Sequence, residues 1–274
     1  MKISVVMIDG GFREHFHTIR FLSKQTLPIS NYEIIWVEYY RKVADELSAC
    51  DGVMTIKLDN PPNKEYHSSY CFNAGIEASK GEIIVIPDAD IAMEKSFLTS
   101  IIKEHEACEK LAMYHYRLDE PKEKHNKVHS YTLDHLRKNA QLNNATNYGG
   151  CLSVRKKWLL EINGYDQDPE FSSGFHANGL DVYTRLKNLG LHVSWNPDEF
   201  IYHPWHPSTL AQSDKYQRQH SIINKRQLNL SYLPNYGLNP DKNKANKDTT
   251  DDKILKQPPN TFDRLKNIFQ RNFS

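Results

Sequence analysis

The sequence has few cysteines and almost no net charge. Its four cysteines lie far apart and form neither a CxxC pair nor the dense pattern of a disulfide scaffold: Cys50, Cys71, Cys108 and Cys151. Thirty-five Lys and Arg residues against 34 Asp and Glu residues leave a formal charge of +1, which gives no support to binding driven by nucleic-acid phosphates. We therefore expect a reducing, cytoplasmic location and no nucleic-acid partner.

A long apolar run is also missing from the N-terminal residues. Residues 1–10 contain one Lys and a short apolar run that stops at Asp9, too short for a signal sequence with its cleavage site or for a membrane span. We interpret Ile3 to Ile8 as a first strand. With 274 residues, the chain is long enough for one large α/β domain or two small ones.

Short apolar runs alternate with helical patterns through the first half of the chain. The runs are apolar throughout, which is typical of strands buried on both faces of a parallel sheet. Expected strands are Ile3 to Ile8, Glu33 to Val37, Val53 to Leu58 and Ile83 to Ile86, and expected helices are Phe16 to Ser23, Val43 to Ala49 and Cys71 to Ala78. This pattern predicts an α/β fold with a Rossmann-like, mainly parallel central sheet and helices on both faces.

Acidic residues follow each of the four predicted strands. They are Asp9, Glu38, Asp59 and the pair Asp88 and Asp90. The carboxyl ends of parallel strands meet at one edge of the sheet, where such folds bind ligands. Two carboxylates separated by one residue suit a divalent cation that keeps positions open for phosphate oxygens. We expect Asp90 to be a direct metal ligand and Asp88 to face a ribose or a metal-bound water.

The second half is predicted to complete the domain at about residue 235. Its expected elements are a helix from Ser96 to Glu109, a strand from Leu111 to Tyr116, a long loop or lid over 119–147, a strand from Cys151 to Val154, helices from Trp158 to Ile162 and Asp181 to Leu189, strand-like runs from Leu191 to Trp195 and Phe200 to His206, and a helix ending near Leu230. Residues 236–260 are predicted to be a polar linker. Residues 261–274 have apolar side chains at helical spacing, which predicts an amphipathic C-terminal helix. It either contacts a membrane surface through residues 262–273 or docks on its own domain or an oligomer partner.

The stretch from Asn73 to Asp90 resembles the central signature of family 2 glycosyltransferases with the GT-A fold. It reads NAGI at 73–76 and ASKGEIIVIPDAD at 78–90, and YGG at 148–150 and GYD at 164–166 follow in the order of that family. The resemblance covers about residues 1–206. It implies a DxD-containing enzyme that depends on a nucleotide sugar, with the donor bound by about residues 1–110 and the acceptor by about residues 111–235.

The resemblance also implies roles for Glu38 and Asn73. Glu38 would contact the base or the ribose, and Asn73 would lie in the helix beside the nucleotide. The alternatives are a solvated strand end for Glu38 and a helix cap for Asn73.

A histidine pair follows the last strand-like run, in the sequence His203-Pro204-Trp205-His206. The resemblance implies a histidine ligand to the cation at this place. Imidazole suits manganese better than magnesium, so Mn²⁺ is expected and Mg²⁺ is the alternative. His203 is the expected ligand and His206 the second candidate, against a surface or core histidine. Trp205 either offers an apolar face to a sugar ring or anchors the core.

The sequence departs from the family where the general base is expected. Relatives carry a Glu-Asp pair that binds the acceptor and supplies the base, and this chain has Asn178-Gly179 there. Neither residue can accept the proton of an acceptor hydroxyl. Asp181 is the predicted catalytic base. Glu170 or His176 could serve instead, or the enzyme uses no such base because it is retaining or inactive. As a structural residue, Asp181 would favour the helix dipole and pair with Arg185 at i+4.

The predicted function is transfer of a hexose or N-acetylhexosamine from a nucleotide diphosphate sugar, with UDP as the expected nucleotide, to a glycan, glycolipid or other hydroxyl acceptor. Inversion and a role in polysaccharide biosynthesis are expected. One alternative is a sugar nucleotidyltransferase, although Asp9 to Arg13 is a poor version of the basic phosphate loop of those enzymes. The other is a glycosyltransferase-like binding protein without turnover, which Asn178-Gly179 would explain.

Overall fold

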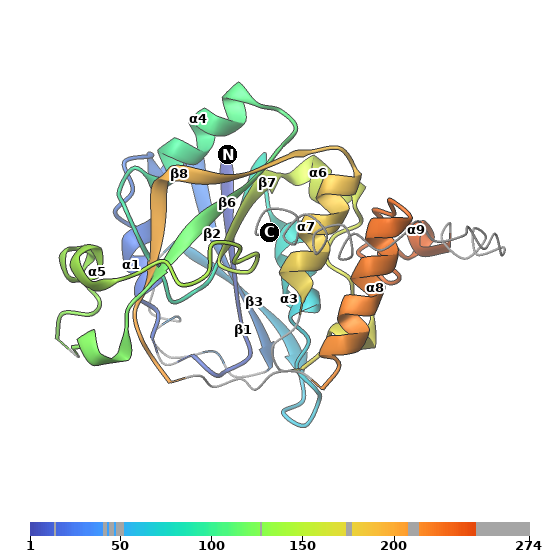
Figure 1. Cartoon of the computed structure of the whole chain (residues 1–274), viewed down its shortest axis with the longest axis horizontal. Helices are drawn as coiled ribbons and strands as arrows, with labels where there is room; N and C mark the ends of the chain where they lie inside the picture. Colours follow the sequence, from blue (N-terminus) through green and yellow to red (C-terminus); the bar gives the residue numbers. More distant parts are fainter. Residues whose placement is uncertain are drawn as a thin grey trace, which may run out of the picture.

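The structure is a computed structural model of the chain, drawn in Figure 1, and it describes residues 1–13, 15–40, 43, 47, 52–126, 128–173, 177–207 and 214–244. Most of the helix predicted from Val43 to Ala49, the alternative base His176 and the predicted C-terminal helix over 261–274 lie outside the described residues. Membrane contact through 262–273 therefore stays a prediction. None of the described helices combines the length and the apolar character needed to cross a membrane.

The described residues form one eight-stranded sheet in the order β3-β2-β1-β4-β7-β6-β8-β5. The strands are β1 (Ile3–Asp9), β2 (Tyr32–Tyr40), β3 (Val53–Asn60), β4 (Ile83–Pro87), β5 (Ala92–Met93), β6 (Leu111–Asp119), β7 (Cys151–Arg155) and β8 (His192–His203). Strands β3, β2, β1 and β4 are parallel to one another, and β6 is parallel to β8. β7 is antiparallel to both β4 and β6, and β5 is antiparallel to β8. The predicted α/β fold is confirmed.

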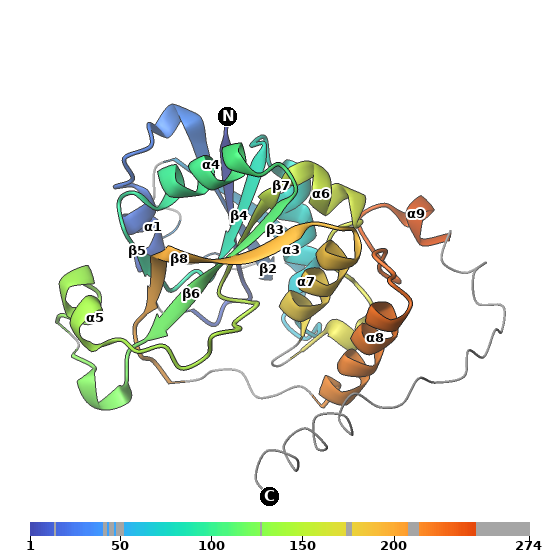
Figure 2. The same cartoon turned by 45° about the horizontal axis from the view of Figure 1, so that its top comes forward.

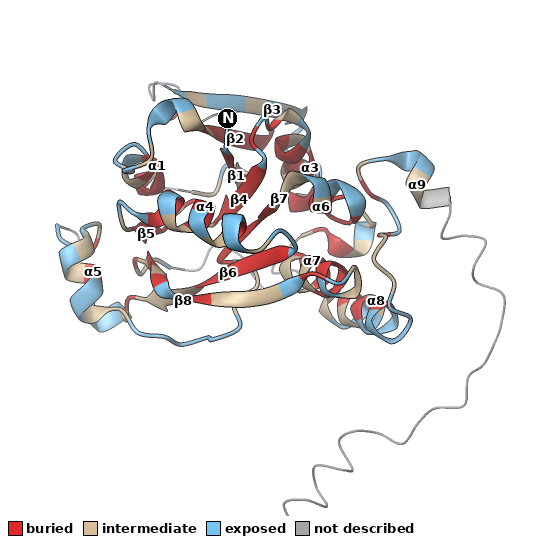
Figure 3. Cartoon of the chain, turned by 90° about the horizontal axis from the view of Figure 1, so that it is seen from above, coloured by how far each residue is buried: buried red, intermediate tan, exposed pale blue. Residues whose placement is uncertain are grey.

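Helices cover both faces of this sheet. They are α1 (His17–Leu22), η1 (Ile29–Asn31), α3 (Ser68–Ala78), α4 (Phe97–Ala107), η2 (Lys122–Lys124), α5 (Leu133–Asn139), α6 (Lys156–Glu161), η3 (Pro169–Phe171), α7 (Asn178–Asn188), α8 (Tyr216–Leu228) and α9 (Pro240–Lys244). Figure 3 shows the buried strands between the two helical layers. Successive strand residues point to opposite faces, so Met7 joins a core with α1 and α4, and Val6 joins a core with α3, α6 and α7.

Helix α3, which contains the start of the Asn73 to Asp90 stretch, packs closely on β1. A Cβ atom at Gly75 would lie 2.3 Å from Val6 Cγ1, so only glycine allows α3 to approach β1 this closely. Beyond β4, the Asp88 N–H donates to the Gly150 carbonyl at 2.9 Å. This hydrogen bond attaches the DxD turn to the residue that precedes β7.

Three parts of the chain differ from the sequence prediction. The two runs predicted after Leu191 form the single strand β8, because the Asn196 side chain accepts from the N–H groups of Asp198 and Glu199 and carries the strand across an irregularity. The predicted lid over 119–147 contains α5. The predicted linker begins later than expected, because residues 236–244 pack on the domain, with the Leu238 N–H donating to the Asn163 carbonyl at 3.0 Å.

Candidate active site

Asp90 lies where the sequence predicts a metal ligand, just beyond the carboxyl end of β4. Its side chain is 16 % exposed and contacts three cationic or imidazole groups. Arg13 Nη1 contacts Oδ2, His203 Nε2 lies 3.6 Å from Oδ1, and His206 Nε2 lies 3.5 Å from Oδ2. Asp90 and the predicted ligand His203 are therefore brought together, and the second candidate His206 joins them.

The three side chains have the geometry and chemistry of a metal site. The Nε2 atoms of His203 and His206 are 3.1 Å apart, and ligand atoms of Asp90, His203 and His206 all lie within 4.8 Å of one another. Two ligands at a right angle on an ion, with bonds of about 2.1 Å, are about 3.0 Å apart. One carboxylate and two imidazoles form a donor set that suits a divalent transition metal such as Mn²⁺. The residues present therefore fit the ion that the sequence predicts.

The two carboxylates of the DxD motif differ in electrostatic environment. Burial opposes ionisation of Asp90, but the charge of Arg13 and the hydrogen bond with His206 outweigh it and hold the pKa of Asp90 well below its usual range. Burial raises the pKa of Asp88, although the ion pair with Arg117 opposes this effect. The hydrogen bond with Asp90 raises the pKa of His206. Asp90 is therefore ionised at neutral pH, as a ligand to a cation must be.

A second layer of charged residues supports this site. Arg117, at the end of β6, lies 2.9 Å from Asp88 Oδ2 through Nη1 and 2.9 Å from Asp119 Oδ1 through Nε. Asp119 Oδ1 in turn lies 3.2 Å from His203 Nδ1. A carboxylate on the far nitrogen of a ligating imidazole fixes the orientation and tautomer of the ring. Asp119 therefore orients His203 with Nε2 toward Asp90.

Glu120 ties the segment after β6 to the loop that carries the histidines. Its carboxylate is buried and accepts from the Trp205 N–H at 2.9 Å, and it contacts His125 Nδ1 at 3.0 Å and His135 Nε2 at 2.6 Å. The Glu120 N–H donates to the His203 carbonyl at 2.9 Å. Burial opposes ionisation, but these hydrogen bonds lower the pKa of Glu120. One ionised side chain thus holds both the predicted lid and the His203 to His206 segment.

Glu38 lies at the predicted edge of the sheet, opposite Asp9 in the register of β2 and β1. It is 1 % exposed, so the alternative of a solvated strand end is wrong. Burial and the neighbouring charge of Asp9 raise the pKa of Glu38 to about 8, and burial raises the pKa of Asp9 as well. The rings of Phe12 and Tyr66, 5.3 Å apart, lie close by around Gly10. This edge combines aromatic rings with two neighbouring carboxyl groups whose pKa values are raised.

The Asn73 side chain is hydrogen-bonded inside the protein. Its amide nitrogen donates to the Tyr165 carbonyl at 2.9 Å, and its amide oxygen accepts from the Tyr165 N–H at 2.8 Å. The residue is 2 % exposed and lies inside α3, so the helix-cap alternative is wrong. Asn73 attaches α3 to the Gly164-Tyr165 turn through both ends of its amide, and its predicted place beside the nucleotide stays a prediction.

Asp181 is placed differently from its predicted role as general base. It is 1 % exposed, with Oδ2 2.8 Å from Arg185 Nε and Oδ1 in contact with Arg226 Nη1 from α8, which lies alongside α7 (Figure 2). Burial opposes its ionisation, but both arginines lower the pKa of Asp181. Both oxygens are occupied inside the protein, so the carboxylate cannot reach an acceptor hydroxyl in this conformation. The predicted pairing with Arg185 is confirmed.

The neighbouring candidates give no base in the described structure. Asn178, in place of the acidic pair of relatives, is 3 % exposed and donates to the hydroxyls of Ser68 at 3.0 Å and Ser69 at 2.8 Å. Glu170 is paired with Arg218 through a 2.6 Å contact. Of the two carboxylate candidates, Asp181 is thus buried between two arginines, and Glu170 is in a partly exposed ion pair.

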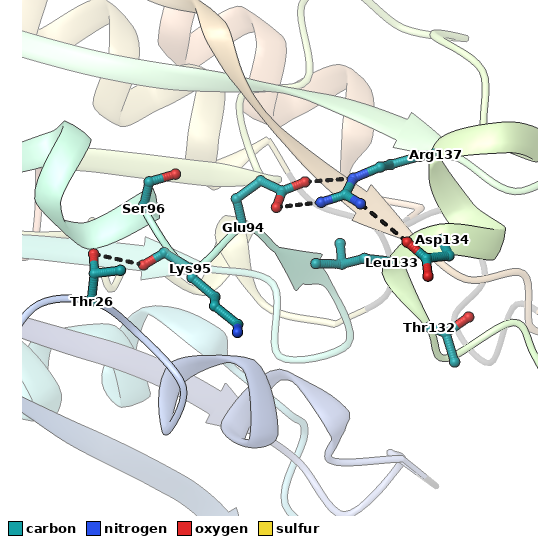
Figure 4. Close-up of a pocket in the computed structure, with 8 residues that line it drawn as sticks. All are labelled: Thr26, Glu94, Lys95, Ser96, Thr132, Leu133, Asp134 and Arg137. Carbon is teal, nitrogen blue, oxygen red and sulfur yellow. Dashed lines mark hydrogen bonds and ion pairs between the residues drawn. The ribbon is translucent and has the colours of Figure 1, made fainter.

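A pocket of about 560 Å³ lies elsewhere, between α5 and the segment after β5 (Figure 4). None of the predicted site residues is among its eight lining residues. Arg137 forms a two-point ion pair with Glu94 and a 3.2 Å contact with Asp134. These charges pair with one another away from the candidate site. Substitutions of Asp134 and Arg137 can therefore serve as controls for substitutions of charged residues at the candidate site.

Comparison with solved structures shows which known fold this chain shares. The chain matches S. aureus TarS 1-349 in complex with UDP-GlcNAc at 15% identity and a TM-score of 0.61, over 84% of this chain and 67% of that one. It matches GalNAc-T7 with UDP, GalNAc and Mn²⁺ at 11% identity and a TM-score of 0.62, over 90% and 54% of the two chains. It matches the mannosyltransferase PcManGT from Pyrobaculum calidifontis, in complex with GDP-Man and Mn²⁺, at 13% identity and a TM-score of 0.53, over 83% and 61%.

These likenesses show the GT-A glycosyltransferase fold, and the chain spans about two thirds or less of the length of each structure. The sequence itself matches the model of the family "Glycosyl transferase family 2" over residues 17–162, more than half of the chain. The chain belongs to glycosyl transferase family 2, as the resemblance implies. Comparison with curated protein sequences finds no match.

Proposed function

We propose that this glycosyltransferase is metal dependent and moves a hexose or N-acetylhexosamine from a nucleotide diphosphate sugar to a hydroxyl of a glycan or glycolipid. The observation that carries the proposal is the convergence of Asp90, His203 and His206 at the carboxyl edge of the sheet. Similar folds have been solved with UDP-GlcNAc, with UDP and Mn²⁺, and with GDP-Man and Mn²⁺. A UDP sugar is the first donor to test.

In this proposal Asp90, His203 and His206 hold the ion, and Asp119 orients His203. When bound, a divalent cation supplies positive charge that stabilises the departing diphosphate. Arg13 and Arg117 add cationic groups beside it. Glu38, at the end of β2, is positioned to contact the base or the ribose. The ion and the two arginines would act where negative charge develops during cleavage of the bond between sugar and phosphate.

The proposal assigns no general base, because Asp181 and Glu170 are both paired. The same observation favours one second candidate, a glycosyltransferase-like protein that binds the donor without transferring the sugar. Calorimetry that shows UDP binding with Mn²⁺, together with no transfer to a broad panel of glycan and glycolipid acceptors, would select it. The family match to glycosyl transferases disfavours the nucleotidyltransferase alternative.

The experiment is an assay of nucleotide release from UDP-glucose, UDP-GlcNAc and GDP-mannose with Mn²⁺, with Mg²⁺ and with EDTA. Loss of several kcal/mol of charge stabilisation corresponds to about 10²- to 10⁴-fold in rate, so Asp90→Asn and His203→Ala should lose activity on that scale. Asp134→Asn and His192→Ala, on exposed residues of α5 and β8, are the matched controls and should retain it. Full activity of Asp90→Asn, or full activity in EDTA, would contradict the metal-dependent function.

A further inference from the structure

Arg13 holds the position that a cation at Asp90 would need. It follows β1 and the turn at Gly11, whose φ of 72° suits glycine. Its Nη1 contacts Asp90 Oδ2, and its Nε donates to the Ile8 carbonyl at 3.4 Å. The Arg13 side chain is only 14 % exposed. The guanidinium is therefore a resident partner of Asp90 and not a solvent-exposed neighbour.

The contact competes with metal binding at the same oxygen. Asp90 Oδ2 faces both Arg13 and His206 Nε2, which lies 3.5 Å away. An ion held by Asp90, His203 and His206 would lie beside the guanidinium, where like charges repel strongly in a partly buried site. An arginine guanidinium stays cationic in proteins, and that of Arg13 lies against the Asp90 carboxylate. Release of Asp90 therefore requires movement of Arg13, because loss of its proton is unfavourable.

We propose that Asp90 exchanges Arg13 for the divalent metal when a nucleoside diphosphate binds, with the guanidinium moving from the carboxylate to the diphosphate. The inference rests on the proposed metal site and adds a coupling between binding of the metal ion and binding of the nucleoside diphosphate. A guanidinium pairs well with phosphate oxygens, so the diphosphate provides a new partner for Arg13. The diphosphate draws Arg13 away from Asp90 and so favours metal binding. The metal displaces Arg13 from Asp90 and so favours diphosphate binding.

Arg117 is not built for the same exchange. It bridges Asp88 and Asp119 through two 2.9 Å contacts, and Asp119 is the residue that orients His203. Neither Asp88 nor Asp119 is one of the three proposed metal ligands, so the contacts of Arg117 are compatible with an ion on Asp90. The exchange is therefore specific to Arg13.

The test is isothermal calorimetry of Mn²⁺ and of UDP, each alone and each in the presence of the other. Arg13→Gln should bind Mn²⁺ without nucleotide at least about fivefold more tightly than the unmodified protein, which is the lower end of ordinary coupling. It should also bind UDP alone more weakly, so that the mutual enhancement of the two ligands falls. Arg137→Gln, which removes the same charge from an exposed ion pair with Glu94, should leave all four affinities unchanged.

Mn²⁺ affinity that is unchanged or weaker in folded Arg13→Gln would overturn the exchange while leaving the metal site in place. Failure of every protein to bind Mn²⁺, even with UDP, would overturn the metal site and the exchange together. If Arg13→Gln does not fold, an NMR measurement on the unmodified protein tests the exchange. The side-chain Nε–H NMR signal of Arg13 should shift when Mg²⁺ and UDP are added together, and an unmoved signal would overturn the proposal.

Discussion

The charged residues around Asp90 and those around Asp181 are arranged in opposite ways. Around Asp90, the side chains of Arg13, Asp90 and His203 are 14–17 % exposed, and several groups compete for the same carboxylate. Around Asp181, the side chains of Asp181 and Arg226 are 2 % and 6 % exposed, and each oxygen has one guanidinium partner. The first cluster can exchange partners with a ligand, whereas the second joins α7 to α8. A charged residue that matches a family motif is therefore a weaker guide to function than the contacts its side chain makes.

The largest expected effect comes from removing the charge of Asp181, which pairs with Arg185 and Arg226. Asp181→Asn leaves Arg185 without its counter-ion and Arg226 with Asp166 alone. Removing one partner of a buried ion pair costs about 3–5 kcal/mol, which should appear as a lower free energy of unfolding in urea. Mn²⁺ binding by the folded fraction should be unaffected, because Asp90, His203 and His206 are unchanged.

Asp134→Asn is the matched control for this substitution. It breaks an exposed i,i+3 pair with Arg137 and should change stability by less than about 1 kcal/mol. The comparison of the two clusters would fail if Asp181→Asn kept its stability and lost sugar transfer. That result would restore Asp181 as the general base.

A smaller effect is expected from Glu120, which supports the metal ligands from behind. Glu120→Gln removes the charge that holds His125, His135 and the Trp205 N–H. Loss of such a supporting partner typically weakens metal binding about 10- to 100-fold, measurable by calorimetry with Mn²⁺. Glu123→Gln, on the exposed 3₁₀ turn η2, should have no effect. Lower stability with unchanged Mn²⁺ affinity would limit Glu120 to a structural role.

The smallest expected effect concerns Glu38 and depends on pH. Its pKa of about 8 in the folded state exceeds the ordinary value of 4.5, so the folded protein keeps a proton that the unfolded chain releases. Stability is therefore lost as pH rises between these values. Glu38→Gln removes this loss, and its free energy of unfolding should gain on the order of 1 kcal/mol over the unmodified protein between pH 6 and pH 7.

Exposed Glu77→Gln is the control for Glu38→Gln, and its difference from the unmodified protein should stay constant over the same pH range. Urea unfolding at several pH values measures both variants. A difference for Glu38→Gln that does not grow with pH would show that Glu38 is ionised in the folded protein.

Much of the donor side could be predicted from the sequence, because strand ends are local features. The apolar runs predict β1 to β4, and the residues that follow them include Asp90 and Glu38. The resemblance to the family predicts His203, which lies at the end of the last strand. The same rule, applied to the end of the Leu111 to Tyr116 run, would also have found Arg117 and Asp119.

The remainder depends on contacts between residues far apart in the chain. Asn73 pairs with Tyr165, 92 residues away, and Asp181 pairs with Arg226, 45 residues away. Neither contact has a periodic or local signal, so both side chains looked free for function. Arg13 and Glu120 were missed for the same reason: a single charged residue beyond a strand gives no indication of its partner until the fold is known.

The most direct test of the central claim is a crystal structure with UDP and Mn²⁺, with anomalous scattering measured at the manganese absorption edge. The account predicts one anomalous peak within about 2.3 Å of a carboxylate oxygen of Asp90 and of the Nε2 atoms of His203 and His206. A peak bound without Asp90 and both histidines, or UDP bound with no peak at this edge of the sheet, would contradict it.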